Sequence, residues 1–128
     1  MNVIEYMQKA YSDPPCWDLV ADVYTNEVVP KARSHWESLR TEDRIKWFSR
    51  ATVSKEVPFI ALLDAQPSQN YDVYYYTNPD KTPHVGVYYD GKILHATSRG
   101  VFYEYPYRIS DEFELKGRWR YNGDDQKI

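Results

Sequence analysis

The sequence predicts an α+β domain in which N-terminal helices pack on a central antiparallel β-sheet. Apolar residues recur at helical spacing in the first part of the chain. From Val57 onward, short runs of β-branched and aromatic residues are separated by turn-forming residues. Helices first and strands after, with short connections, are typical of this fold class. The 128 residues suit one domain, 1–128, whose polar tail from about Asn122 is expected to fray.

Two helices are expected before the strands. Residues 2–11 predict a short amphipathic helix behind an Asn2 cap. The stretch 12–15 ends this helix and begins a second, because Ser or Asp caps a helix and proline is tolerated in the first turn. We expect the second helix to begin near Cys16 and to end at Pro30, with an apolar stripe formed by Cys16, Leu19, Val20 and Val23.

The rest of the chain supplies charged helical sequence and then strands. The stretch 31–51 is rich in charge, and residues 41–43 are expected to cap a fresh helix start within it. Its apolar positions are Trp36, Leu39, Ile45, Trp47 and Phe48. Strands are expected over 59–63, 72–76, 84–89, 92–97, 101–105 and 117–121.

The hairpin 84–97 decides where two histidines point. Asp90 and Gly91 readily take the positive φ angles of a two-residue type I′ turn, which places Gly86 opposite His95. Because residues alternate between the faces of a strand, His84 and His95 share one face. As diagonal neighbours they lie about 7–8 Å apart at the backbone, within reach of two imidazole rings. The other face carries Val85, Val87, Leu94 and Ala96.

These residues predict nucleophilic catalysis by a thiol. Cys16 is the single cysteine, at a helix start, where the helix dipole and a nearby imidazole lower a thiol pKa. If the histidine face packs onto that helix start, His84 is the general base and His95 orients it. The backbone amide of Cys16 is a natural oxyanion donor. Asn70 or Asp72 is an alternative orienter.

Composition excludes several other functions. Sixteen Lys and Arg against 19 Asp and Glu give a net charge of −3 without a basic cluster, so no nucleic-acid partner is expected. The sequence contains no apolar run of about 18 residues, so no membrane-spanning segment is predicted. The first residues lack the features of a signal peptide, so we expect synthesis in the cytoplasm without an export signal. No cofactor or metal is expected, although one Cys and two His can also hold zinc.

The cysteine and histidine motifs resemble those of the NlpC-type family of papain-like cysteine peptidases, which cleave peptide stems of bacterial cell walls. The motifs are Cys16-Trp17-Asp18-Leu19-Val20 and His84-Val85-Gly86-Val87-Tyr88 with Ile93-Leu94-His95-Ala96, and the resemblance extends from Tyr11 to about Tyr121. It implies a papain-like fold with Cys16 as nucleophile, His84 as base and His95 as the third, polar residue. It also makes Tyr11 the nearest candidate for a tyrosine that assists the oxyanion.

The resemblance implies hydrolysis of the amide between D-glutamate and the diamino acid of a peptidoglycan stem peptide. A hydrolase without an export signal is expected to be delivered to the cell wall by a phage tail or by a secretion machine. The pairing of Cys16 with Trp17 is similar to phage-tail members of the family and favours the tail. The expected partners are stem peptides, and tail proteins or a delivery machine. Two alternatives stay open: a catalytically silent structural component of a phage tail, and an amidase or acyltransferase on the same fold.

Overall fold

A computed structural model describes residues 1–37, 58–80 and 82–123 of the chain. Within them, six strands form one antiparallel sheet in the order β1-β6-β2-β3-β4-β5. The strands are β1 Phe59–Ala61, β2 Val73–Thr77, β3 Pro83–Tyr89, β4 Lys92–Thr97, β5 Gly100–Glu104 and β6 Glu114–Tyr121. The helices are α1 Val3–Met7, α2 Pro15–Glu27, α3 Ala32–Glu37 and α5 Pro106–Ile109. The predicted α+β class is confirmed.

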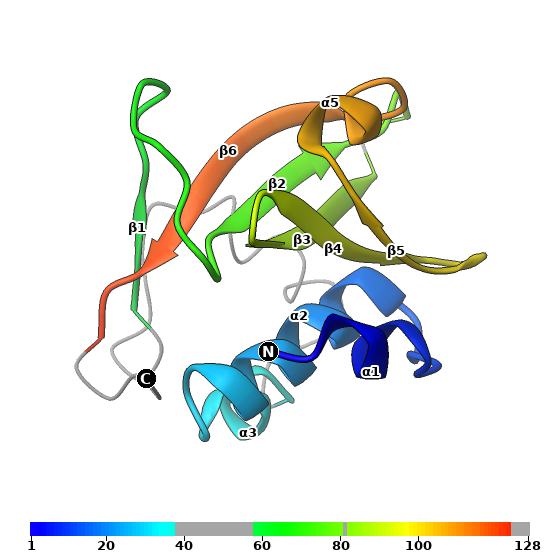
Figure 1. Ribbon diagram of the computed structural model, residues 1–128, viewed down its shortest axis with the longest axis vertical. Coiled ribbons are helices and arrows are strands. Elements are labelled where there is room, and N and C mark those ends of the chain that lie inside the picture. The colour runs from blue at the N-terminus through cyan, green and yellow to red at the C-terminus, as the bar shows by residue number, and fades with distance from the viewer. Residues whose placement is uncertain (38–57, 81, 124–128) are drawn as a thin grey trace.

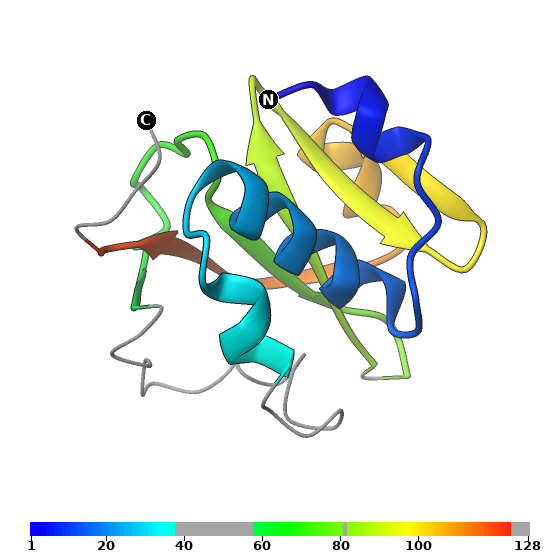
Figure 2. The same cartoon turned by 90° about the horizontal axis from the view of Figure 1, so that it is seen from below.

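The two faces of the sheet are covered by different numbers of the described helices. In Figure 1, α1, α2 and α3 lie on one side of the sheet and the short α5 lies on the other. Figure 2 shows α2 running across the face of the sheet, with α1 beside it next to β5. The expected helix start at 41–43, the apolar residues Leu39, Ile45, Trp47 and Phe48, and the side chain of Trp36 lie outside the part that the structure describes.

The helix α2 begins where the sequence places it. Its N-cap is Pro14 and its first residue is Pro15, so neither Ser12 nor Asp13 caps it as expected. Proline suits this position because the first amides of a helix have no intrahelical acceptor. The predicted apolar stripe is confirmed by the buried residues Cys16, Leu19, Val20 and Val23, to which the structure adds Trp17, Ala21 and Tyr24.

The predicted hairpin register is also confirmed. Gly86 pairs with His95, Val87 with Leu94, Tyr88 with Ile93 and Tyr89 with Lys92. Asp90 and Gly91 have φ values of 50° and 89°, as a type I′ turn requires. The last strand, β6, is longer than the expected 117–121 and lies between β1 and β2.

The hairpin separates two apolar clusters. Val85, Val87, Leu94 and Ala96 pack in one cluster with Cys16 and the other buried residues of α2. Ile93 belongs to a second, smaller cluster on the opposite face, with Tyr74, Tyr76 and Ile109. The expectation that the histidine face packs onto α2 is therefore wrong. On the aliphatic face, the helix removes four apolar side chains from water, which favours this packing.

Candidate active site

The two imidazoles of the hairpin meet, as the register predicts. Nε2 of His84 lies 2.9 Å from Nδ1 of His95. The rings are 5.1 Å apart and nearly perpendicular, at 83°. Gly86 makes this possible, because a Cβ built there would lie 3.1 Å from Cβ of His95 and 2.6 Å from Cγ2 of Ile93. Local strand geometry thus brings together two of the three predicted catalytic residues.

A carboxylate that the sequence analysis missed extends this pair. Oε2 of Glu104 lies 2.7 Å from Nε2 of His95. Glu104 is on β5, opposite Ile93, so it is the diagonal neighbour of His95 on the same face. Pairing β5 with β4 as the next antiparallel strand would have revealed this contact. The three side chains His84, His95 and Glu104 form a hydrogen-bonded row across three adjacent strands.

The histidine pair is buried beneath aromatic side chains. Phe113 stacks on His84 with ring centroids 4.5 Å apart at 13°, and Tyr76 lies 6.4 Å away. Burial, with the neighbouring charge of His95, lowers the pKa of His84 from 6.5 to about 3. Burial also lowers the pKa of His95, although Glu104 and Glu112 act in the opposite direction. Burial therefore favours the neutral form of both imidazoles.

Cys16 lies in the core at the start of α2, with 5% of its surface exposed. Burial raises its thiol pKa, whereas backbone hydrogen bonds from Val85, Trp17 and Cys16 itself act to lower it. The expected net lowering is wrong, because desolvation of the sulfur outweighs the helix terminus and the amides. The amides of Val85, Trp17 and Cys16 therefore favour the thiolate, although less strongly than burial favours the thiol.

The Cys16 thiol and the His84 side chain lie on different sides of the peptide unit that joins His84 to Val85. The sulfur contacts the backbone of Val85, the residue that follows His84. No hydrogen bond joins Cys16 to either imidazole among the residues that the structure describes. The paired residues of β3 and β4 end at Gly86 and His95, so the pairing stops next to Val85. The structure thus places Cys16 beside the main chain of His84 without joining the two side chains.

The Tyr11 hydroxyl is bound to a residue further along α2 than Cys16. Its hydroxyl donates to Oδ2 of Asp22 over 2.8 Å. Asp22 lies about 9 Å further along α2 than Cys16, at 1.5 Å per residue. Burial, together with the bond to Asp22, raises the pKa of Tyr11. As an oxyanion donor, Tyr11 would first have to release Asp22.

The two alternative orienters are engaged elsewhere. The carboxylate of Asp72 is buried and accepts two hydrogen bonds from Arg120, at 2.8 and 2.9 Å. Oδ1 of Asn70 accepts from the backbone N–H of Asp90 and supports the hairpin turn. Neither residue contacts His84, so His95 is the neighbour that orients it.

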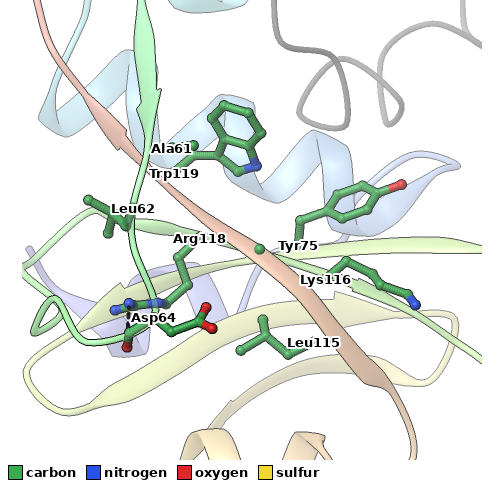
Figure 3. Close-up of a pocket in the computed structure, with 9 residues that line it drawn as sticks. Ala61, Leu62, Asp64, Tyr75, Leu115, Lys116, Arg118 and Trp119 are labelled. Atoms are coloured by element: carbon green, nitrogen blue, oxygen red, sulfur yellow. Dashed lines mark hydrogen bonds between the residues drawn. The ribbon is translucent and has the colours of Figure 1, made fainter.

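Two hollows are relevant to ligand binding. The first, of about 300 Å³, lies beside the start of α2 between residues 9–15 and 96–101, and Tyr11, Pro15, Ala96 and Val101 contribute to its walls. The second, of about 350 Å³, lies over β1, β6 and β2, with Tyr75 and Trp119 on one side of β6 and Arg118 and Asp64 on the other (Figure 3). Of these two, the first adjoins a predicted catalytic residue, because Pro15 in its wall precedes Cys16.

The described parts of the chain contain no group of three or more His, Cys, Asp or Glu arranged to bind a metal ion. None of the helices described has the length and apolar character needed to cross a membrane. Comparisons with protein-family models, curated proteins and solved structures give no significant match.

Proposed function

We propose that this protein is a cysteine hydrolase of the papain-like NlpC type, with Cys16 as nucleophile, His84 as general base and His95 as orienter. The observation that carries the proposal is that Cys16 and His84 both lie beside the peptide unit between His84 and Val85. The sulfur of Cys16 contacts the backbone of Val85. Nε2 of His84 is engaged by His95, and Nδ1, the ring nitrogen nearest the main chain, has no hydrogen-bond partner among the described residues. The free nitrogen and the thiol therefore flank the same peptide unit, from opposite faces of β3.

The neutral state of both groups determines the mechanism. With a raised thiol pKa and a His84 pKa of about 3, the resting pair is thiol and imidazole. His84 accepts the thiol proton as the sulfur attacks the carbonyl carbon, and returns it to the leaving amine. The C–N bond breaks and a thioester remains, which water then hydrolyses with His84 again as base. The amides around the sulfur are suited to stabilise negative charge in these steps.

The choice of substrate rests on the resemblance of the two motifs to cell-wall endopeptidases. This resemblance favours, as the bond that is cleaved, the amide between D-glutamate and the diamino acid of a stem peptide. It also favours delivery of the protein by a phage tail or a secretion machine. The 300 Å³ hollow beside Pro15 supports this choice, because an extended peptide needs a groove next to the nucleophile. A related amidase or acyltransferase would form the same acyl-enzyme and differ only in the acceptor.

Mass spectrometry of purified sacculi and of defined stem peptides tests the proposal. We expect fragments cut after D-glutamate from the natural protein and none from Cys16→Ala. His84→Ala should abolish turnover, whereas His95→Ala should retain some turnover if His95 only orients His84. Absence of amide cleavage by the folded protein would reject the proposal.

The burial of Cys16 favours a second candidate, a catalytically silent component of a phage tail. The thiol is 5% exposed and has no hydrogen bond to His84 among the described residues. Iodoacetamide labelling separates the two candidates. In a hydrolase, His84→Ala slows labelling of Cys16 because the base is lost. In a silent protein, His84→Ala leaves the labelling rate unchanged, and Cys16→Ala leaves tail assembly intact.

A further inference from the structure

The protons in the row from Glu104 to His84 can be assigned one after another. The Glu104 side chain is 39% exposed, so water can solvate its carboxylate. A carboxylate only accepts hydrogen bonds. The 2.7 Å contact from Oε2 of Glu104 to Nε2 of His95 therefore requires a proton on that nitrogen.

The second contact follows from the first. A neutral imidazole carries one N–H and one lone pair, and burial, which lowers the pKa of His95, favours this neutral form. With its proton on Nε2, His95 can only accept at Nδ1. His84 must then donate its Nε2–H to Nδ1 of His95 across 2.9 Å, and its own Nδ1 keeps the lone pair.

We propose that Glu104 is a positioning residue that selects, through His95, the His84 tautomer with an unprotonated Nδ1. This inference deepens the proposed function and rests on it for its catalytic meaning, because Nδ1 is the nitrogen that receives the Cys16 proton. Without the carboxylate, the row can also run in reverse, with Nδ1–H of His95 donating to Nε2 of His84. That arrangement protonates Nδ1 of His84 and removes the base.

The surroundings of the pair supply a matched control. Glu112, which follows α5, raises the His95 pKa through its charge alone, whereas Glu104 on β5 also makes a hydrogen bond. On the other side, Tyr76 of β2 and Phe113 face His84. Removing the charge of Glu112 therefore changes the electrostatics of His95 without removing an acceptor from its ring.

Two-bond ¹H–¹⁵N NMR spectra of the labelled protein at pH 7 identify the protonated nitrogen of each imidazole. The chain has three histidines, and His35→Gln removes the signals that do not belong to the pair. We expect both His84 and His95 in the Nε2–H form. A proton on Nδ1 of either residue would overturn the inference, and this test needs neither activity nor a change at Glu104.

Paired variants then test the role of Glu104 itself. Glu104→Gln can donate as well as accept, so we expect mixed tautomers at both histidines and a kcat lowered by about 10- to 100-fold with little change in KM. Glu112→Gln should keep the original tautomers. Unchanged tautomers in Glu104→Gln would refute the role. The expected tautomers in a protein that cleaves no amide would retain this inference and reject the proposed function.

Discussion

Nε2 of His84 lies 2.9 Å from Nδ1 of His95, and both rings are almost fully buried. A contact of this kind cannot hold two imidazolium ions, because both nitrogens would then be donors. The pair is therefore stable only while at least one ring is neutral. This relationship links the stability, titration and chemistry of the site.

Acid should destabilise the fold through the histidine pair. The pKa of His84 is about 3 in the folded protein and about 6.5 in an unfolded chain. Between these values the unfolded state binds more protons, so the free energy of unfolding rises with pH, by at most about 1.4 kcal/mol per pH unit for one histidine. The lowered pKa of His95 acts in the same direction.

Urea unfolding between about pH 4.5 and 6.5, above the range where most carboxylates titrate, measures this effect. His84→Gln should flatten the slope because one of the two groups no longer titrates. A free energy of unfolding that is constant across this window would contradict the burial of neutral histidines.

Phe113 should control the titration of His84. Its ring stacks on the imidazole at 4.5 Å and keeps water away from one face. Phe113→Ala should raise the His84 pKa from about 3 by about 1–2 units, because hydration favours the charged form. An NMR titration measures the shift. Tyr107→Ala is the control, since Tyr107 is 65% exposed and stacks on Tyr105. An unaltered His84 titration in folded Phe113→Ala would show that other groups exclude the water.

Gly86 should tolerate no side chain. A Cβ there would lie 2.6 Å from Cγ2 of Ile93 and 3.1 Å from both Cβ of His95 and the backbone oxygen of Leu94. Gly86→Ala should lower the free energy of unfolding by about 1–3 kcal/mol and displace His95. Gly117→Ala, whose nearest neighbour would be Nε1 of Trp119 at 3.8 Å, should change it by less than about 0.5 kcal/mol. Equal losses in the two variants would argue against close packing at Gly86.

Asp72 is expected to stabilise the fold and not to orient the histidine pair. Its side chain is 1% exposed and is neutralised by Arg120. Arg120→Met should cost about 3–5 kcal/mol, because a buried carboxylate loses its partner. Lys116→Met, which removes an exposed ion pair with Glu114, should cost less than about 1 kcal/mol. Denaturant unfolding compares the two. The tautomers of the histidine pair should be unchanged in Arg120→Met, and a change would restore Asp72 as an orienter.

Local sequence determined the hairpin and the start of α2. Asp90 and Gly91 fix the turn, the alternation of residues fixes the faces, and these two rules suffice to bring His84 to His95. The proline pair and the apolar stripe locate α2 and bury Cys16 at its first turn. Each of these features depends on residues close in the chain, so the pattern alone specifies it.

Tertiary structure decided the rest of the site. The hairpin offers two faces, and α2 selected the aliphatic one, which left the histidines to Phe113 and Tyr76 on the opposite side. The pairing of β5 with β4 brought Glu104 to His95. Burial also reversed the expected pKa shift of Cys16. Neighbours from distant segments set the dielectric surroundings and the hydrogen-bond partners of a buried group, and a local pattern carries no information about them.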